Sequence, residues 1–383
     1  MIESRMGITV RQKGGYQAYI PKPLPPVPPV QFDDELHLLL SEADRALARL
    51  DGMATVLPNA DLFVAMYVKK EALLSSQIEG TQASLQGVLE FEADIVPGDD
   101  INEVKEVINY IRAMDEGLKR TSTELFSLET LQEVHRVLLK GTRGGKKEPG
   151  KIRTVQNWIG PPGSNLYSAA FVPPPPEKLR ELLEDLEAFI VADDRIPPLI
   201  KIGLVHAQFE TIHPFIDGNG RMARLFITFY LCRKGILARP LLYLSIYLKQ
   251  HRAEYYSLLQ EVRIQGDWES WLKFFLRGIT EVSNEALANA REIISLKERL
   301  VATLVRNDVR GLNAVRLLDL LFSKPVVTVA DVSSALGISH QPAYDLVNQF
   351  EKLEILREIT GKKRYKKYLF VDYITIIERG TNP

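Results

Sequence analysis

The chain has 383 residues, of which 45% are hydrophobic and 25% charged, and its formal net charge is −1 at pH 7. This length is enough for two or three domains with a sizeable core, while the balanced charge excludes a global field that draws the whole molecule to nucleic acid or to a membrane. The single cysteine, Cys232, excludes an intrachain disulfide and a cysteine-rich zinc site.

The N-terminal residues lack the apolar core of a signal peptide. The strongest apolar run, "PLLYLSIYL" at 240–248, is too short to span a bilayer. Because the chain also has no disulfide framework, we expect a cytoplasmic protein without a membrane partner. The stretch "PKPLPPVPPV" (21–30) cannot form a helix, so it predicts an extended strap on the surface.

Helical periodicity begins after this strap. Apolar residues at three- and four-residue spacing predict a helix from Asp33 to about Leu50. A second helix is expected to begin near Asn59 or Asp61, which are good caps, and to end near Gly80. Further helices are expected over 82–93, 101–118 and 127–140.

The segment 141–176 breaks the helical pattern because it is rich in glycine and proline. "RTVQNWI" (153–159), followed by "GPPGSN", predicts a strand and a turn, and hence a small β-hairpin. Helical patterns then return and continue to about residue 304. The bulk of the chain is therefore predicted to be a mainly α domain with one small β insertion.

The C-terminal part differs in kind. Residues 328–356 have the form helix, short turn containing Gly337, second helix, and the basic stretch 357–371 predicts a two-stranded hairpin. This is a winged-helix arrangement. Six basic residues and one acid lie between Arg357 and Lys367, which is the electrostatic footprint of a DNA-binding domain. Small winged helices also serve as protein–protein modules, so DNA contact and homodimer formation are both considered.

The stretch "HPFIDGNGRMAR" (213–224) crowds a histidine, an acid, an asparagine and two arginines into one loop. The letters "GNGRMA" match a dinucleotide fingerprint, but the strand before it and the acid about twenty residues after it are missing. An ordinary interhelical turn would not require this set of side chains. A polyphosphate-binding loop is the third interpretation, and it accounts for all of them.

The physical case for phosphate binding rests on the glycines and arginines. Gly218 and Gly220 allow backbone N–H groups to close on an anion at a helix N-terminus. Arg221 and Arg224 would oppose the helix dipole there unless an anion lay between them, and their spacing of three lets both contact one phosphate chain.

The remaining polar residues of the loop suit phosphoryl or nucleotidyl transfer. Asp217 is able to hold the Mg²⁺ that accompanies nucleotide phosphates, and Asn219 offers a neutral donor. His213 titrates near neutrality and is suited to take a proton from an attacking hydroxyl. No Walker A sequence is present, so the loop is not a P-loop.

"HPFIDGNGR" resembles, without a mismatch, the HPFx(D/E)GNGR signature of the Fic (filamentation induced by cAMP) domain family. The resemblance implies an all-α core and AMPylation, in which AMP moves from ATP to a hydroxyl on a target protein and pyrophosphate is released. It implies that His213 is the general base and that Asp217 ligates Mg²⁺. It further implies that Asn219 supports the α-phosphate, while Arg221 meets the β-phosphate and Arg224 the γ-phosphate.

The resemblance extends to the nucleotide site and the flap. Gly220 stands where the family's kinase-like Doc branch has Lys, which favours nucleotide transfer. The segment 153–165 looks like the flap that pins a target segment by strand-like pairing. The ATP-binding residues implied in this way are Gly218, Asn219, Gly220, Arg221, Met222, Ala223, Arg224, Tyr255 and Tyr256.

"SSQIEG" (75–80) resembles the family's inhibitory motif, (S/T)xxxE(G/N), through Ser75, Glu79 and Gly80. The implied inhibition is a carboxylate of Glu79 that pairs with Arg224 and fills the place of the γ-phosphate. Taken alone, this short pattern is common in helices, and Gly80 would simply be a helix C-cap.

Four regions are expected: 1–120 with the inhibitory helix, 121–280 as Fic catalytic core, 281–305 as linker helix and 306–383 as winged helix. We expect a protein adenylyltransferase that uses ATP and Mg²⁺, is autoinhibited by Glu79, and modifies an unidentified target protein or itself. One alternative is a de-AMPylase, because a glutamate in this place also positions water. Another is a DNA-binding regulator whose Fic domain senses nucleotide.

Overall fold

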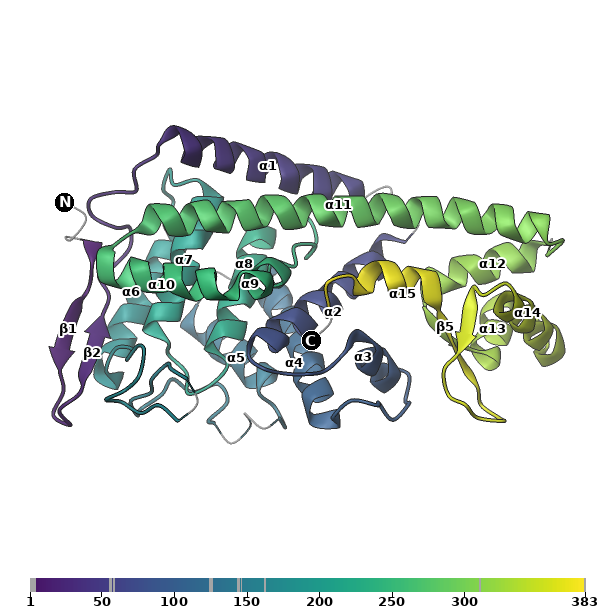
Figure 1. Ribbon diagram of the computed structural model, residues 1–383, viewed down its shortest axis with the longest axis horizontal. Helices are drawn as coiled ribbons and strands as arrows, with labels where there is room; N and C mark the ends of the chain where they lie inside the picture. Colours follow the sequence, from purple (N-terminus) through teal and green to yellow (C-terminus); the bar gives the residue numbers. More distant parts are fainter. Residues whose placement is uncertain are drawn as a thin grey trace.

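The computed structural model describes residues 5–54, 57, 59–123, 127–142, 145, 147–161, 163–309 and 311–381. Over these residues the protein is mainly α-helical, with two small antiparallel sheets at opposite ends of an elongated body (Figure 1). The predicted fold class is thereby confirmed. No helix in the described ranges combines the length and apolarity needed to cross a membrane.

An N-terminal hairpin that the sequence did not reveal forms the first sheet. Strands β1 (Ile8–Arg11) and β2 (Gln17–Ile20) pair in antiparallel register, with Ile8 opposite Ile20. Each strand has only four residues, which is too short for a clear alternating pattern. The proline-rich strap follows it without helix or strand, as expected from its composition.

The longest element is α11 (Trp268–Arg306), which runs along most of the molecule (Figure 1). Helix α1 (Asp34–Ala54) packs along it and buries Leu36, Leu47 and Leu50. Because α11 continues without a break through residue 280, the helical body and the C-terminal unit are joined by one helix.

Helix α2 (Ala60–Ile78) begins as the sequence predicted, because the Asn59 side chain accepts a hydrogen bond from Leu62 N–H at 2.9 Å. It ends at Glu79, and Gly80 follows with φ of +100°. The next helices are α3 (Leu85–Glu92), α4 (Ile101–Thr123) and α5 (Leu128–Leu138).

The segment expected to form a hairpin over 153–171 is less regular than predicted. It contains a single antiparallel bridge, Ile159 opposite Phe171. Prolines at 173–176 have no N–H to continue a ladder. The guanidinium of Arg153 instead donates to the carbonyls of Val155 and Pro174, so a side chain replaces strand pairing.

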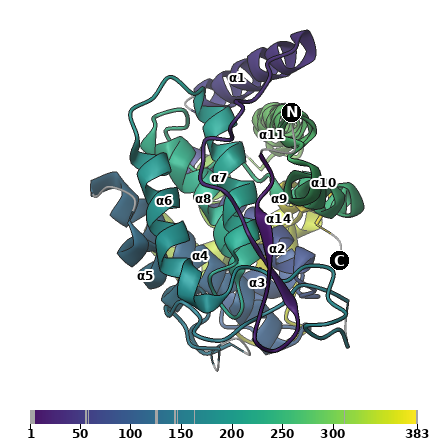
Figure 2. The same ribbon diagram turned by 90° about the vertical axis from the view of Figure 1, so that its left-hand side faces the viewer.

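Two central helices carry the candidate site. Figure 2 looks onto the hairpin end and shows α7 (Pro198–Ile212) and α8 (Asn219–Arg233) in the middle of the body. Both are buried on nearly every side, and α8 buries Asn219, Arg221 and Arg224 together with its apolar residues. The elements around them include a 3₁₀ turn (Pro176–Lys178), α6 (Leu179–Val191), α9 (Ser245–Gln250) and α10 (Arg252–Gln265).

The C-terminal unit is a winged helix, as predicted. Helix α12 (Leu312–Leu321) leads into β3 (Val326–Thr328), and the helix–turn–helix consists of α13 (Val329–Leu336) and α14 (His340–Lys352). Strands β4 (Leu356–Glu358) and β5 (Lys367–Phe370) form the wing, in the sheet order β3-β5-β4. A last helix, α15 (Val371–Glu378), returns to contact α11 and α2.

Candidate active site

The loop 213–218 joins α7 to α8 and is fixed by its own backbone and by Arg153. His213 ends α7 in the left-handed conformation, with φ of 50°, and Gly218 begins α8 with φ of 80°. Arg153 donates from its backbone N–H to the Pro214 carbonyl (3.0 Å) and from Nε to the His213 carbonyl (2.9 Å). The loop therefore presents its side chains from a rigid frame.

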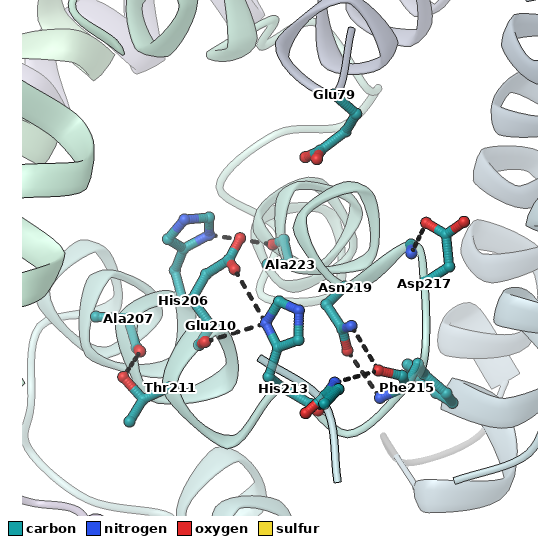
Figure 3. A network of polar contacts seen from close by, with 12 residues as sticks. Glu79, His206, Ala207, Glu210, Thr211, His213, Phe215, Asp217, Asn219 and Ala223 are labelled. Atoms are coloured by element: carbon teal, nitrogen blue, oxygen red, sulfur yellow. Dashed lines mark hydrogen bonds and ion pairs between the residues drawn. The ribbon is translucent and has the colours of Figure 1, made fainter. Parts of the chain in front are cut away.

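Asn219 closes this loop on itself (Figure 3). Its Oδ1 accepts from Phe215 N–H at 2.9 Å, and its Nδ2 donates to the Phe215 carbonyl at 2.9 Å. Asn157 of the flap donates to the same carbonyl at 2.9 Å. Asn219 therefore fixes the shape of the loop, a role that the sequence did not indicate.

A second support, His135 of α5, was missed by sequence reasoning. Gly150 N–H donates to Nδ1 at 2.8 Å, so Nε2 carries the proton and donates to the Asp217 carbonyl at 2.9 Å. The ring stacks on Phe215 with 3.7 Å between centroids. Burial lowers the pKa of His135 to about 4, which keeps this support neutral. His135 was missed because it lies far from the loop 213–218 along the chain.

The ring of His213 is mostly buried, with 18% of its side chain exposed. Its Nδ1 lies 3.3 Å from the Glu210 carbonyl oxygen, which can only accept, so Nδ1 holds the proton and Nε2 is left as a base. Burial, together with the charges of Arg153 and Arg263, lowers the pKa of His213 to about 3. The base is therefore neutral at physiological pH.

Glu210 links His213 to a buried polar chain that the sequence did not predict. Its Oε2 lies 3.9 Å from His213 Nδ1, and its Oε1 accepts from the Tyr255 hydroxyl at 3.3 Å. That hydroxyl is also 2.9 Å from Nε2 of His206. Burial raises the pKa of Glu210 to about 7, against the opposing charge of Arg224.

The expected tyrosine pair is split by this arrangement. Tyr255 is fully buried and its hydroxyl is engaged with Glu210 and His206. Tyr256 is 41% exposed, with its ring centroid 5.0 Å from that of Tyr255. Tyr256 alone offers an accessible ring face to a nucleotide.

Arg221 is buried at 5% exposure and incompletely paired. Its Nη2 lies 3.4 Å from Asp217 Oδ1, and Nη1 lies 3.8 Å from Glu106 Oε2. Within the described part of the chain, Nε and Nη1 have no hydrogen-bond partner. Buried donors without acceptors are costly, so this guanidinium is prepared to receive an anion.

Arg224 is bound by the end of α2. Its Nε donates to Ser75 Oγ at 2.7 Å, and its Nη2 donates to the Ser75 carbonyl at 3.0 Å and to Glu79 Oε1 at 2.7 Å. Burial alone would raise the pKa of Glu79, but the charge and hydrogen bond of Arg224 outweigh it and lower the pKa. The residues of the SSQIEG motif are therefore brought to the arginine that the sequence analysis paired with them.

The carboxylate of Glu79 lies over the first turn of α8. A Cβ placed on Gly220 would be 2.3 Å from Glu79 Oε1 and 3.0 Å from Arg224 Nη1. Figure 3 shows Glu79 reaching toward the helix that carries Asn219 and Ala223. The N-cap of this helix is Gly218, which has no side chain to cap it, so the Glu79 carboxylate lies at a helix start that favours anions.

Met222 and Ala223 lie deeper in the same helix. Both side chains are fully buried, and Met222 N–H donates to the Gly218 carbonyl at 3.0 Å. The Ala223 carbonyl lies 3.3 Å from His206 Nδ1. These two residues support the loop from below rather than presenting side chains to a ligand.

Asp217 is the one carboxylate of the loop, and its side chain is 38% exposed. Its Oδ1 accepts from Gly218 N–H at 2.6 Å. In the described ranges no group of three His, Cys, Asp or Glu side chains is able to hold a metal by itself. Mg²⁺ characteristically takes one or two carboxylates together with substrate phosphates and water, so a single exposed carboxylate beside the loop fits that ion.

Family models match three parts of the chain. Residues 37–119 match the model described as Fic/DOC family N-terminal, residues 125–231 match Fic/DOC family, and residues 315–368 match HTH DNA binding domain. The solved Fic family protein from Desulfovibrio desulfuricans G20 superposes with a TM-score of 0.60 at 20% identity, covering 90% of this chain and 98% of that chain. A Fic domain containing signaling protein from Bacteroides thetaiotaomicron VPI-5482 gives 0.51 at 16% identity, covering 68% and 96%. Both structures share the fold.

Curated relatives match the helical body. Protein adenylyltransferase fic-1 of Caenorhabditis elegans is 30% identical over 205 residues, which are 51% of this chain and 37% of that protein. Protein adenylyltransferase Fic of Aedes aegypti is 29% identical over 254 residues, 62% of this chain and 46% of that protein. The chain thus spans less than half the length of these relatives.

Proposed function

Because the chain belongs to the Fic/DOC family, we propose that it is a protein adenylyltransferase, which moves AMP from ATP to a hydroxyl side chain of a target protein. The observation that carries this proposal is the buried guanidinium of Arg221, whose Nε and Nη1 have no hydrogen-bond partner among the residues that the structure describes, beside the N-terminus of α8. The names of the curated relatives support the same activity.

The ATP phosphates would bind at the start of α8. The backbone N–H groups of its first turn point out of the helix, where a phosphate is favoured by the dipole and by direct hydrogen bonds. Arg221 would meet the β-phosphate, and Arg224 the γ-phosphate once Glu79 has left it. Asp217 would hold Mg²⁺, which neutralises phosphate charge when bound. The ring of Tyr256 supports an adenosine site next to these groups.

His213 would act as the general base. Its neutral Nε2 takes the proton of the target hydroxyl while the hydroxyl oxygen bonds to the α-phosphorus and the bond to pyrophosphate breaks. The Glu210 carbonyl orients the ring through Nδ1. General-base catalysis of this kind contributes roughly 10²- to 10⁴-fold to the rate.

Glu79 would inhibit this reaction by holding Arg224 and by lying against Gly220. The alternative direction, removal of AMP by a water that Glu79 positions, uses the same residues. Incubating the Glu79→Gly variant with a cell lysate and either α- or γ-labelled ATP tests AMP transfer, and release of that label after wild type is added tests the reverse direction. Covalent label from the α-position alone supports AMP transfer, and label from the γ-position contradicts it.

A second function, DNA binding, is favoured by the wing. Lys362, Lys363 and Arg364 are exposed there, and Tyr365 is 88% exposed between them and Lys366. The helix–turn–helix model that matches residues 315–368 supports the same partner. Loss of binding to duplex DNA with rising salt tests this function; salt-independent retention would contradict it.

We retain the division of the chain into 1–120, 121–280, 281–305 and 306–383 as a proposal, together with homodimer formation and self-modification. We also propose the cytoplasm as the site of action. The single cysteine supports that compartment, since reducing conditions do not favour disulfide scaffolds.

A further inference from the structure

The inhibitory helix α2 is held at both ends by the winged-helix unit. At its start, Asn59 Nδ2 donates to Ser323 Oγ, directly after α12, at 2.8 Å. At its end, Gln77 Nε2 donates to the carbonyl of Thr381 at 2.9 Å. Figure 1 shows α15 returning from the winged helix to lie beside α2. No part of the proposed catalytic chemistry requires these contacts.

The tail, residues 379–381, is fastened to the catalytic body. Arg379 forms a two-point ion pair with Glu292 of α11, with Nη2 at 2.8 Å from Oε1. Gly380 has φ of +76°, and a Cβ there would lie 2.5 Å from Ile246. Thr381 is 4% exposed. The tail is therefore held in one defined position, in which the Thr381 carbonyl contacts Gln77.

Gln77 connects this tail to the position of Glu79. Its Oε1 accepts from Lys249 Nζ at 2.8 Å, and its Nε2 also donates to the Ala83 carbonyl at 3.1 Å. Glu79 lies two residues further, at the C-cap, where helices fray unless their last turn is held. Fixing Gln77 thus fixes the carboxylate that reaches Arg224.

The wing faces an acidic surface of the catalytic body. Residues 90–100 contain five acids and no base. Glu90 and Asp99 of this stretch line a hollow of about 400 Å³ together with Ile359, Thr360 and Lys362 of the wing. A polyanion bound to the wing would approach these carboxylates. The repulsion would favour a winged helix that has moved away from the body.

We propose that the winged-helix unit clamps α2 in its inhibitory position, and that duplex DNA bound to the wing releases this clamp and so switches on AMP transfer. This inference rests on the proposed function. Coupling between two binding sites is reciprocal. ATP bound at Arg224 must therefore raise the affinity for DNA by the same factor by which bound DNA raises the affinity for ATP. Loss of one buried hydrogen bond of the clamp should change the ratio of released to clamped protein about fivefold.

The test compares wild type with a chain that ends at Arg379, with Ser323→Ala and with Glu79→Gly. The truncation removes the Thr381 carbonyl and leaves Gln77 Nε2 only the Ala83 carbonyl as acceptor. Ser323→Ala removes the acceptor of Asn59 Nδ2 and leaves the Asn59 cap on α2. We expect the truncation and Ser323→Ala each to raise the rate of AMP transfer about fivefold. Arg180→Ala, an exposed change on α6 whose side chain pairs with Glu184 and not with the clamp, is the matched control and should not raise it.

The DNA arm adds a short mixed-sequence duplex at low salt. DNA should stimulate wild type, leave Glu79→Gly unchanged, and have no effect when Lys362, Lys363, Arg364 and Lys366 are all changed to Gln. Saturating DNA that leaves the wild-type rate unchanged, while Glu79→Gly is active, would overturn the proposal. Clamp variants that behave as wild type would overturn it as well.

A readout without catalysis separates this inference from the proposed function. Amide hydrogen exchange over residues 70–79 should speed up in the truncated chain and in wild type with DNA. If Glu79→Gly transfers no AMP, the proposed function fails, and the exchange measurement still decides the coupling. Unchanged exchange in both cases would refute it.

Discussion

Removing the carboxylate of Glu79 should strengthen ATP binding by an amount set by its ion pair with Arg224. The two side chains meet at 2.7 Å, with Arg224 2% and Glu79 36% exposed. A hydrogen bond to a charged group contributes about 1.5–3 kcal/mol when buried, and an exposed pair contributes less than about 1 kcal/mol. Because one partner of this ion pair is buried and the other is partly exposed, we take its contribution as about 2 kcal/mol, which corresponds to a factor of about thirty in the Kd for ATP.

Titration of ATP and Mg²⁺ by calorimetry measures this factor directly. The apparent Kd equals the intrinsic Kd divided by the fraction of protein whose Arg224 is free to bind ATP, so Glu79→Gly should bind ATP about thirtyfold more tightly than wild type. Glu79→Gln keeps one neutral hydrogen bond and should fall between the two. Glu92→Gln, which breaks an ion pair with Lys69 at 3.3 Å elsewhere, is the control. Equal Kd values in all four proteins would refute the role of Glu79 as a phosphate substitute.

Three further predictions concern protons and salt. The transfer rate of Glu79→Gly should stay flat as the pH falls through the usual pKa range of histidine, because burial lowers the pKa of His213 to about 3; a fall centred near pH 6.5 would contradict this. Burial raises the pKa of Glu210 to about 7, so its contribution to folding is present below its unfolded pKa and is lost as the pH rises through about 7. Urea unfolding should therefore show Glu210→Gln gaining up to about 3 kcal/mol relative to wild type between mildly acidic and mildly basic pH, and a constant difference would disprove the shift. Replacing Lys362, Lys363, Arg364 and Lys366 by Gln should reduce the salt slope of DNA affinity by about three to four, whereas an unchanged slope would place DNA elsewhere.

The predictable part of the fold followed from local chemistry. Asn59, Ser127 and Gly337 lie at the helix boundaries where caps and stops are expected, and they make those caps. The flap is less regular than the expected hairpin because the side chain of Arg153, within the same segment, binds the carbonyls of Val155 and Pro174, and no residue spacing reveals such a side-chain contact.

The site divides in the same way. The loop 213–224 was recognisable because its spacing itself carries the chemistry, whereas Glu79 was recognisable only through the resemblance of SSQIEG to the inhibitory motif. His135 and Glu210 were not, because each acts through one contact with the loop and belongs to an ordinary helical pattern. The role of Asn219 in closing the loop likewise required its two bonds to Phe215 to be seen.

The most direct test of the central claim is intact-mass analysis of Glu79→Gly after incubation with ATP and Mg²⁺, in the presence of a bacterial lysate as source of targets. A covalent gain of one AMP on the variant or on a target, absent in the Glu79→Gly, His213→Ala double variant, is the predicted result. The same gain in both proteins would contradict the assignment of His213 as base. No gain in either would contradict AMP transfer itself.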